Sequence, residues 1–530
     1  MKTPEGSVHY IKEVQPEPDI SNPEVQKALL FDQDPEFLKP ILEFSTKIAS
    51  CPPDPKHPEF QPQALMIGGF VRDTLRGGHP KDVDIEVLGL SPERLVELLE
   101  QMFPGKVEKV GQQFGTLKIK VSDQVELDVS IPRRESKSGM GHKGFEVHSD
   151  PTMSVQEAAR RRDFTWNAIS ADIMKGEVFD SYGGIQDLKD RVLRVTDPER
   201  FIEDPLRVMR AVQFAARFDF TIEPESFKLM QEMVAKGDLN ELPPERITAE
   251  MEKLLLKAER PSIGFEVARQ LGIIEKHFPE LHNLIDVQQE KEWHPEGDVW
   301  VHTMMVVDAA AKIIRQPERE FTNQEKIQVM LGSLGHDFGK PATTKLIDGK
   351  IRALGHEDAG REPVKQFAKR LSFGQDVVDA MAAAAGDHLK PVQLYNELKK
   401  GALDEKSYAN AVRRFIKRLG STSWKVLVAC SESDSRGRTI PGCDVDPYLP
   451  GEAMAKAVAE HQLDTVGTKD LIGGKDIFAV ATELGVDIKP GKQFGEYIRI
   501  IETLRDHEQV TTHEEAIEHL KKLMKTDFGK

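Results

Sequence analysis

Two aspartates in a strictly alternating stretch constrain this chain more than any other feature. From Asp82 to Val87 polar and apolar residues alternate, so a strand places Asp82 and Asp84 on one face and the branched apolar residues on the other. Two carboxylates side by side on a rigid strand repel each other unless a cation lies between them. Mg²⁺ is the expected cation, because this hard ion binds carboxylate oxygens together with substrate phosphates. Asp82 and Asp84 are therefore predicted magnesium ligands.

A glycine pair precedes that strand. Gly68 and Gly69 follow an apolar run and open a short helix expected over residues 70–75. Glycine lets backbone N–H groups approach a phosphate where a Cβ would obstruct, and the start of a helix adds positive potential. Arg72, one turn into this helix, is expected to meet phosphate oxygens. Taken alone, a glycine pair is usually a turn and an Asp-x-Asp pair usually a solvated strand edge, but the two in this order are hard to explain as scaffold.

A third carboxylate is expected on a neighbouring strand. Residues 115–121 and 125–131 predict two further strands, and in the second Glu126 and Asp128 share one face. Asp128 is the candidate to join the aspartate pair. Glu126 is the alternative, and an exposed acidic strand face would explain the same spacing. The glycine-rich, highly charged residues 133–148 have no period and predict a mobile loop.

The length and composition indicate a multidomain protein without membrane spans. At 530 residues the chain is too long for one compact domain. It contains no signal-peptide core and no apolar stretch long enough to span a bilayer. Three scattered cysteines without metal-ligand spacing predict free thiols in a reducing cytoplasm. The net charge of −16 argues against a protein that coats nucleic acid with its whole surface, but it permits local basic grooves.

Two later helices are expected to carry charged residues on one face. The first opens within residues 159–170, and the second spans residues 201–218, with Pro205 near its start where a missing N–H does no harm. Charged and polar residues recur in both at one-turn spacings. Such a face is usually exposed to solvent and forms surface ion pairs, which is the alternative interpretation. The residues so spaced are Arg161, Arg162, Asp163 and Asn167 in the first segment and Glu203, Asp204, Arg207 and Arg210 in the second.

Histidine and aspartate residues recur at long intervals in the second half of the chain. A single buried histidine is more often a satisfied core residue than a ligand. A histidine, then an adjacent His-Asp pair before Gly-Lys, then a distant aspartate, is far more specific. Imidazole and carboxylate together suit Mn²⁺, Ni²⁺, Fe²⁺ or Zn²⁺ better than Mg²⁺ alone. The candidate ligands are His302, His336, Asp337 and Asp434, with His356 and His388 lying between them in the sequence.

The order Gly-Gly-x-Val-Arg-Asp followed by Lys-Asp-x-Asp resembles the nucleotidyltransferase head of class II tRNA nucleotidyltransferases, the CCA-adding enzymes, and of bacterial poly(A) polymerases. The resemblance implies that residues 161–167 contact the triphosphate and ribose of a nucleotide and that residues 203–207 read the base. It implies a neck-stabilising role for residues 245–250 and a flexible loop over residues 133–148 that helps to switch nucleotide choice. The implied nucleotide-binding residues are Gly68, Gly69, Arg72, Asp73, Arg162, Asp163, Asn167, Glu203, Asp204, Arg207 and Arg210, and the catalytic ones are Asp82, Asp84 and Asp128.

Two of these residue types suit cytosine and adenine. Both bases present an exocyclic amino donor beside a ring-nitrogen acceptor, while ionised aspartate only accepts and arginine only donates hydrogen bonds. Asp204 and Arg207 side by side therefore match CTP and ATP. UTP and GTP present a carbonyl and an N–H at those positions, so buried polar groups would stay mispaired.

The histidine and aspartate pattern resembles the HD phosphohydrolase superfamily, an all-helical fold that binds one or two metals. The tail, from about residue 470, resembles the C-terminus of bacterial CCA-adding enzymes that carry this domain. Because the four expected ligands are present, a functional metal site is expected. The alternative is a degenerate domain kept for RNA docking.

These observations predict an α+β protein, with an N-terminal mixed β-sheet nucleotidyltransferase head followed by an all-helical neck, HD domain and tail. The expected function is addition of CCA to the tRNA 3′ end from CTP and ATP with Mg²⁺, by a monomer or homodimer. A poly(A) polymerase or an enzyme that adds only C or only A is the alternative within the class. An HD hydrolase with a nucleotide-binding head is the alternative outside it. The expected segments are a partly disordered N-terminal extension (1–40), the head (41–180), the neck (181–290), the HD domain (291–440) and the tail (441–530).

Overall fold

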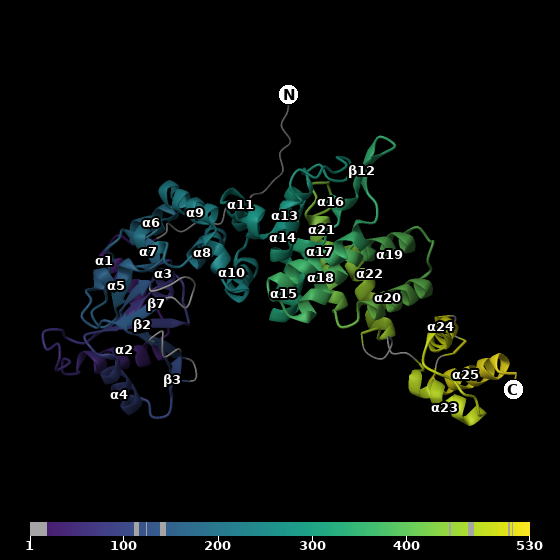
Figure 1. The fold of residues 1–530 in the computed structure, drawn as a ribbon, viewed down its shortest axis with the longest axis horizontal. Coiled ribbons are helices and arrows are strands. Elements are labelled where there is room, and N and C mark those ends of the chain that lie inside the picture. The colour runs from purple at the N-terminus through teal and green to yellow at the C-terminus, as the bar shows by residue number, and fades with distance from the viewer. Residues whose placement is uncertain are drawn as a thin grey trace. The chain divides into compact units, whose positions relative to one another are not determined.

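The computed structural model describes residues 18–110, 116–122, 125–137, 145–444, 447–464, 471–506, 509–510 and 512–529. This part of the chain forms two compact units (Figure 1). The first contains the described residues up to Ala258 together with Ile263–Lys276, and the second contains Glu259–Ser262 with the described residues from His277 onward. The boundary therefore lies inside the predicted neck.

The first unit is built on a mixed seven-stranded sheet, as predicted for the head. Its strands are β1 (Gln63–Ile67), β2 (Val83–Leu88), β3 (Val107–Val110), β4 (Thr116–Lys120), β5 (Glu126–Ser130), β8 (Ser170–Asp172) and β9 (Glu177–Phe179), in the order β3-β4-β5-β2-β1-β8-β9. β2 and β5 pair in parallel, and the other neighbours pair antiparallel. Val83, Ile85 and Val87 are buried, which confirms the predicted apolar face of β2.

Helices from the N-terminal part of the chain pack on this unit. They are α1 (Pro23–Phe31), α2 (Pro35–Ala49), α3 (Gly69–Leu75) and α4 (Pro92–Met102). α1 contacts α3 and β9, while α2 contacts β1. Within the predicted N-terminal extension, residues 18–40 are ordered, because α1 and the start of α2 bury Leu30 and Leu38. Residues 1–17 lie outside the described residues.

Residues 133–148 contain a strand pair where a mobile loop was predicted. β6 (Arg133–Lys137) pairs antiparallel with β7 (Phe145–Ser149). The pairing satisfies backbone groups across the hairpin, and a charged sequence without alternating apolar residues gives no sign of it. Residues 138–144, at the tip, lie outside the described residues.

The helix predicted to open within residues 159–170 does not form. α5 (Val155–Arg160) ends there, and after a turn the 3₁₀ helix η1 (Thr165–Asn167) leads into β8. In the turn, Asp163 Oδ1 accepts a hydrogen bond from the backbone N–H of Phe164 at 2.9 Å. An aspartate that binds the backbone locally competes with a helix, which explains the break.

The neck is mostly helical. Its elements are α6 (Gly184–Asp190), β10 (Val192–Leu193), α7 (Pro198–Phe201), α8 (Leu206–Phe218), β11 (Thr221–Ile222), α9 (Pro224–Lys236), η2 (Asp238–Glu241), α10 (Pro244–Lys257), α11 (Pro261–Gln270) and α12 (Ile273–His277). β10 and β11 form a short parallel pair, so the neck is not all-helical as predicted.

The single helix predicted over residues 201–218 is divided in two. α7 ends at Phe201 and α8 begins at Leu206. Asp204 Oδ1 accepts a hydrogen bond from the backbone N–H of Leu206 at 3.1 Å, and Pro205 precedes α8 with a helical φ of −59°. Asp204 and its neighbour Glu203 therefore lie in the connecting turn and not on a helix face.

Aromatic side chains join α8 to η1. Trp166 is fully buried, and its ring centroid lies 5.0 Å from that of Phe214 and 5.6 Å from that of Phe218. Phe164 stacks on Trp166 at 5.6 Å. Each such aromatic pair contributes about 0.5–1.5 kcal/mol beyond the area it buries. The cluster therefore fixes charged residues of α8 relative to those around η1.

The described residues of the second unit form helices and one β-hairpin. Its elements are α13 (Pro279–His282), α14 (Val299–Ile313), η3 (Pro317–Arg319), α15 (Asn323–Gly335), α16 (Lys340–Thr343), β12 (Thr344–Ile347), β13 (Lys350–Ala353), α17 (His356–Arg370), α18 (Gln375–Asp387), α19 (Lys390–Lys399), α20 (Glu405–Leu419), α21 (Trp424–Arg436), α22 (Leu449–His461), α23 (Gly474–Leu484), α24 (Lys492–Asp506) and α25 (His513–Asp527). α14, α15, α18 and α21 pack together. The tail helices α23 to α25 enclose an apolar core of their own around Ile477, Tyr497 and Leu520.

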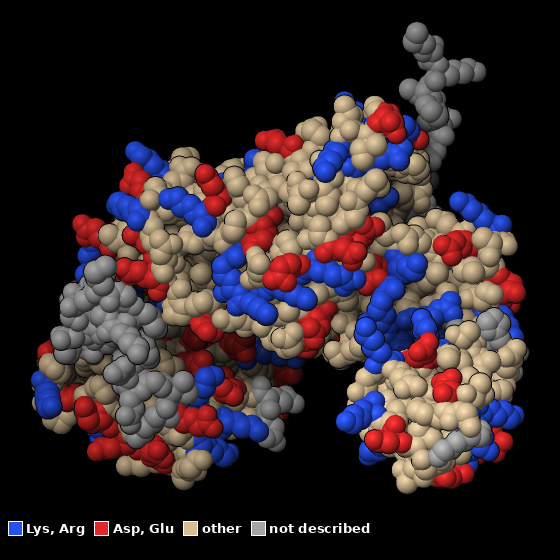
Figure 2. All heavy atoms as spheres, turned by 45° about the vertical axis from the view of Figure 1, so that its right-hand side comes forward, with Lys and Arg blue, Asp and Glu red and all other residues tan. Residues whose placement is uncertain are grey.

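Three further features of the described residues concern membrane spans, cysteines and surface charge. Within the described part of the chain, no helix combines the length and the apolar character that crossing a membrane requires. Cys51, Cys430 and Cys443 are free. On the face shown in Figure 2, Lys and Arg side chains are interspersed with Asp and Glu side chains.

Replacing Gly184 with alanine should destabilise the first unit. A Cβ at this position would lie 2.3 Å from the carbonyl oxygen of Thr165 in η1, so backbone must shift. Such overpacking costs about 1–3 kcal/mol, and the melting temperature should fall by about 2–4 °C for each kcal/mol lost. Thermal unfolding followed by circular dichroism measures the change. Gly491→Ala is the control, because no heavy atom lies within 4 Å of its added Cβ. Equal melting temperatures of the two variants would show that η1 can shift to admit the added Cβ at no cost in stability.

Candidate functional site

One cavity of the first unit collects most of the residues predicted for catalysis and nucleotide binding. Its volume is about 850 Å³. The predicted residues that line it are Gly68, Gly69, Arg72, Asp73, Asp82, Asp84, Asp128, Arg162, Asp163, Asn167, Asp204, Arg207 and Arg210. Glu203 is not among the described residues of this lining, because its carboxylate turns to Arg200 Nη1 at 2.7 Å.

The carboxylates on the wall of the cavity come from two parallel strands. Asp84 of β2 lies directly opposite Asp128 of β5 in the register, and Asp82 immediately precedes β2. Burial raises the pKa of Asp84, the charge of Arg162 opposes this, and the neighbouring Asp128 and Asp82 carboxylates raise it further. Burial is thus the main cause of the shift, and the two neighbouring carboxylates add to it.

Glu126 differs from Asp128 in its surroundings. Its side chain is 57% exposed, and it does not line the cavity among the described residues. Lys118 Nζ lies 2.9 Å from a Glu126 oxygen and 3.2 Å from Asp128 Oδ1. The hydrogen bonds that Lys118 donates to these two carboxylates raise its pKa. Asp128 is therefore the better placed of the two candidates for a third carboxylate.

The glycine pair lies beside these carboxylates. Gly68 has a φ of +62°, a left-handed conformation that strains other residues, and its missing Cβ would lie 3.9 Å from Asp84 Oδ2. The position therefore combines a glycine-only backbone with a close approach to the acidic wall. This agrees with the predicted loop for a phosphate next to a metal site.

Arg72 is held by protein oxygens. Its Nε and Nη2 donate to the two carboxylate oxygens of Asp73 at 2.7 and 2.6 Å, and its Nη1 donates to Asn167 Oδ1 at 2.8 Å. The guanidinium also lies over the rings of Trp166 and Phe218, 5.3 and 4.8 Å from their centroids. Since three of its donor groups are committed, Arg72 joins α3 to η1, and its contact with phosphate stays a prediction.

Asp163 connects the same region to α8. Its Oδ1 accepts from Asn167 Nδ2 at 2.9 Å, and its Oδ2 accepts from Arg210 Nε at 2.7 Å. Burial raises the pKa of Asp163, but the Arg210 charge and these hydrogen bonds outweigh burial and lower it. Arg162 Nη2 donates to the buried carboxylate of Glu86 at 3.0 Å. The predicted residues around η1 thus form one network of fixed orientation.

Asp204 and Arg207 lie at the start of α8 and are both anchored. Asp204 Oδ2 accepts from Arg246 Nη2 at 3.0 Å. Arg207 donates through Nη1 to the carbonyl oxygen of Arg200 at 2.6 Å and through Nη2 to that of Arg161 at 2.7 Å. Carbonyl acceptors orient a guanidinium without neutralising its charge. The remaining donors of Arg207 and the Asp204 carboxylate share the cavity.

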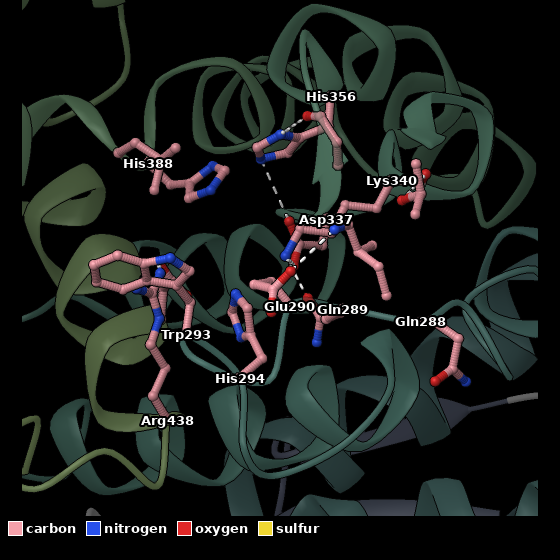
Figure 3. Close-up of a pocket in the computed structure, with 15 residues that line it drawn as sticks. Gln288, Gln289, Glu290, Trp293, His294, Asp337, Lys340, His356, His388 and Arg438 are labelled. Atoms are coloured by element: carbon pink, nitrogen blue, oxygen red, sulfur yellow. Dashed lines mark hydrogen bonds and ion pairs between the residues drawn. The ribbon is translucent and has the colours of Figure 1, made fainter. Parts of the chain in front are cut away.

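The second unit brings the predicted HD ligands together. His302 comes from α14, the His336–Asp337 pair follows α15, and Asp434 comes from α21. His302 Nε2 lies 3.0 Å from Asp434 Oδ1, and His336 Nε2 lies 3.1 Å from Asp337 Oδ2. All four side chains are at most 5% exposed. Asp337 and Asp434 line a cavity of about 280 Å³. Figure 3 shows Asp337 in this cavity, with dashed lines to His356 and Lys340.

The imidazoles of this cluster have their outer nitrogens occupied. Nδ1 of His302 bonds Glu296 Oε1 at 2.8 Å, and Nδ1 of His336, His356 and His388 bond the backbone carbonyls of Ser333, Ala353 and Ala384 at 2.8, 2.8 and 3.0 Å. An acceptor at Nδ1 orients each ring, so that Nε2 is the nitrogen left for a metal ion. Second contacts of this kind are common for histidines that bind metals.

The donor set fits one or two metal ions. His302, His336 and Asp337 offer one group of ligand atoms within 4.8 Å of one another, and Asp337, His356 and His388 offer a second. Asp337 Oδ1 is buried and has no hydrogen-bond partner among the described residues. Burial, followed by the charge of His336, lowers the pKa of His388 to about 3, so this imidazole is neutral.

Comparison with known proteins identifies the family. Sequence profiles match the Poly A polymerase head domain over residues 64–194, the probable RNA and SrmB-binding site of polymerase A over residues 219–285 and the HD domain over residues 299–415. The multifunctional CCA protein of Methylobacillus flagellatus is 35% identical over 378 residues, which cover 70% of this chain and 84% of that protein. This chain belongs to the CCA-adding enzyme and poly(A) polymerase family. The multifunctional CCA protein of Actinobacillus pleuropneumoniae serotype 5b is also 35% identical, over 71% of this chain and 86% of its own.

Solved structures of family members share the fold. The Bacillus stearothermophilus CCA-adding enzyme in complex with CTP matches with a TM-score of 0.59 at 21% identity, over 94% of this chain and 99% of that one. The Thermotoga maritima CCA-adding enzyme complexed with tRNA matches with a TM-score of 0.53 at 19% identity, over 94% and 98% of the two chains. The predicted head, helical neck and HD domain are therefore confirmed at the level of fold.

Several residues of these sites were not singled out as ligand contacts in the sequence. Arg246, Glu250, Lys253 and Lys257 of α10 all line the large cavity. Their spacing of four, three and four residues places them on one helix face, so helical periodicity could have revealed them. Arg217, Trp293, His294 and Glu296 were missed as well, because they belong to no spacing pattern that points to a site.

Proposed function

We propose that this chain transfers cytidylate and adenylate from CTP and ATP to the 3′ end of tRNA in the cytoplasm. The observation that carries the proposal is the parallel register that brings Asp84 opposite Asp128 in a cavity shared with Asp204 and Arg207. The names of the relatives, multifunctional CCA proteins, support CCA addition over poly(A) synthesis or partial addition. The free cysteines agree with a reducing compartment.

The residues present fit Mg²⁺. Asp82, Asp84 and Asp128 would hold it, and when bound it supplies positive charge at the phosphate under attack and at the leaving pyrophosphate. In the reaction, the 3′-hydroxyl of the tRNA loses its proton to water as its oxygen forms a bond to the α-phosphorus of the nucleotide. The bond from that phosphorus to the α–β bridging oxygen breaks, and pyrophosphate leaves with the electron pair. The acidic wall lies beside Gly68, so a triphosphate at the glycine loop meets both.

The charged residues at the start of α8 would select the base. Asp204 accepts from the exocyclic amino group of cytosine or adenine, and Arg207 donates to the ring nitrogen. Their protein partners, Arg246 and the carbonyls of Arg200 and Arg161, hold both groups before the base arrives. Pre-orientation of this kind lowers the cost of ordering at binding.

Replacing Asp82 or Asp84 with alanine should abolish nucleotide incorporation into a tRNA that lacks its 3′ end, because each change removes a ligand from the metal site. Asp128→Ala should behave alike, and tRNA binding should persist in all three. The measurement is transfer of labelled CTP and ATP at saturating Mg²⁺. Glu126→Ala is the matched control, an acid on the same strand that is exposed and outside the cavity lining. Near-normal transfer by Asp84→Ala would remove the basis of the proposal.

Arg207→Ala should change which nucleotide is used more than how fast transfer runs. Loss of one charge-assisted hydrogen bond costs about 1.5–3 kcal/mol, or about tenfold to hundredfold in kcat/KM for CTP and ATP. UTP and GTP never make that bond, so discrimination against them should shrink. Measuring kcat/KM for the four triphosphates tests this. Arg200→Ala, a half-exposed ion pair of the same turn, should change all four only slightly. Equal losses for all four with Arg207→Ala would indicate a purely structural role.

The HD cluster supports a second activity, metal-dependent hydrolysis of phosphomonoesters or 2′,3′-cyclic phosphates. The rings oriented through their Nδ1 atoms, and the buried Asp337 Oδ1 that lacks a hydrogen-bond partner among the described residues, favour this over a degenerate domain for RNA docking. His302, His336, Asp337 and Asp434 would hold Mn²⁺, Ni²⁺, Fe²⁺, Zn²⁺ or Mg²⁺, which when bound supplies an activated water. The carboxylate wall of the first unit argues against a chain whose only chemistry is that of the HD site.

The double variant His336→Ala, Asp337→Ala should lose this hydrolysis but keep CCA addition, since the two sets of ligands lie in different units. It should also lose any rise in melting temperature that Mn²⁺ or Ni²⁺ produces in the wild-type protein. His282→Ala, an exposed histidine of the same unit, serves as the control. A wild-type protein that neither hydrolyses these substrates nor gains stability from any of the metals would favour the docking role.

A further inference from the structure

Arg217 is a charged residue of the large cavity that the family motifs leave unused. It lies in the last turn of α8, its side chain is 25% exposed, and it lines the same cavity as the acidic wall and the residues that would select the base. A partly exposed guanidinium on the wall of a cavity can bind an anion that enters the cavity.

The positive charge around Arg217 is poorly balanced. The guanidiniums of Arg72, Arg76 and Arg217 lie 4.8, 4.5 and 4.9 Å from the centre of one ring, that of Phe218. Both carboxylate oxygens of Asp73 accept hydrogen bonds from Arg72. Arg217 Nη2 lies 3.9 Å from Asp73 Oδ2, which is beyond hydrogen-bond distance. Burial and the charge of Arg72 lower the pKa of Arg217. An anion in the cavity would relieve this repulsion.

The position of Arg217 along α8 indicates which anion. Ten residues separate it from Arg207, so the two lie roughly 15 Å apart along the helix at 1.5 Å per residue. A nucleoside triphosphate whose base meets Arg207 therefore points its phosphates toward the other end of α8. The glycine loop lies on that side, because a Cβ on Gly69 would be 3.5 Å from Arg72 Nη2.

We propose that Arg217 binds the terminal phosphates of the incoming CTP or ATP, and the same oxygens in pyrophosphate before it leaves. The proposal rests on the function proposed above and adds to it a phosphate contact outside the glycine loop. Arg72 holds the site together through Asp73 and Asn167, and Arg217 supplies the charge that faces the ligand. Arginine suits this task because its planar fork can bind two phosphate oxygens at once.

The test compares Arg217→Met and Arg217→Lys with Arg76→Met. Methionine keeps an apolar stem over Phe218 but removes the charge. We expect Arg217→Met to raise KM for CTP and ATP, and the dissociation constant of pyrophosphate measured by calorimetry, each by about tenfold to hundredfold. Arg217→Lys should recover part of both losses. Arg76→Met should change them less than threefold, because Arg76 contacts the same ring but is not among the described residues of the cavity lining.

Two readouts separate this role from others. A phosphate contact affects the four triphosphates equally, so the preference for CTP and ATP should be unchanged, unlike the effect expected at Arg207. A rise in KM for tRNA alone would assign Arg217 to the tRNA backbone and overturn the proposal, as would unchanged pyrophosphate binding. A wild-type protein that binds pyrophosphate through Arg217 but adds no nucleotide would contradict the proposed function and leave this contact intact.

Discussion

The parallel pairing of β2 and β5 brings two carboxylates together that would otherwise avoid each other. Asp84 and Asp128 are directly opposed, and the raised pKa of Asp84 reflects both burial and the neighbouring charges. Lys118 and Arg162 offset part of the repulsion but are shared with Glu126 and Glu86. The site therefore retains a demand for positive charge that a divalent cation can meet. The glycine loop and the turn at Asp204 line the same cavity as this acidic wall.

A second interaction holds the opposite walls of the cavity in register. Arg72 reaches from α3 to Asn167 of η1, and Asn167 is tied through Asp163 to Arg210 of α8. Each link of this network is a hydrogen bond between charged or amide groups. The guanidiniums of Arg72 and Arg210 also lie over the rings of Trp166 and Phe214. Such a network is costly to leave half-satisfied, so its members support one geometry. The spacing between the acidic wall and α8 is thus set by side chains that need not touch the substrate.

The local sequence pattern was enough to predict the sheet and the types of candidate ligand. It did not predict where turns and short hairpins interrupt or replace the expected elements. The alternation around Asp84 predicted β2, because a buried face leaves a period of two in the sequence. The division of residues 201–218 was missed because Asp204 and Pro205 are compatible both with a helix start and with the interior of a first turn. The β6–β7 pair depends on backbone pairing across a hairpin, and a charged sequence without alternating apolar residues does not predict it. Arg217 was missed because its significance arises from Arg72 and Phe218, which only folding brings beside it.

The two candidate metal sites differ in a way that follows from their donor atoms. The acidic wall of the first unit offers carboxylate oxygens, which favour a hard ion that keeps room for phosphate oxygens. The second unit offers imidazoles whose Nδ1 atoms are already bound to Glu296 or to backbone carbonyls, so their Nε2 atoms are presented as fixed, softer ligands. Affinity at the imidazole site should fall as pH drops, since protons compete for the same lone pairs. The two sites are therefore expected to prefer different ions.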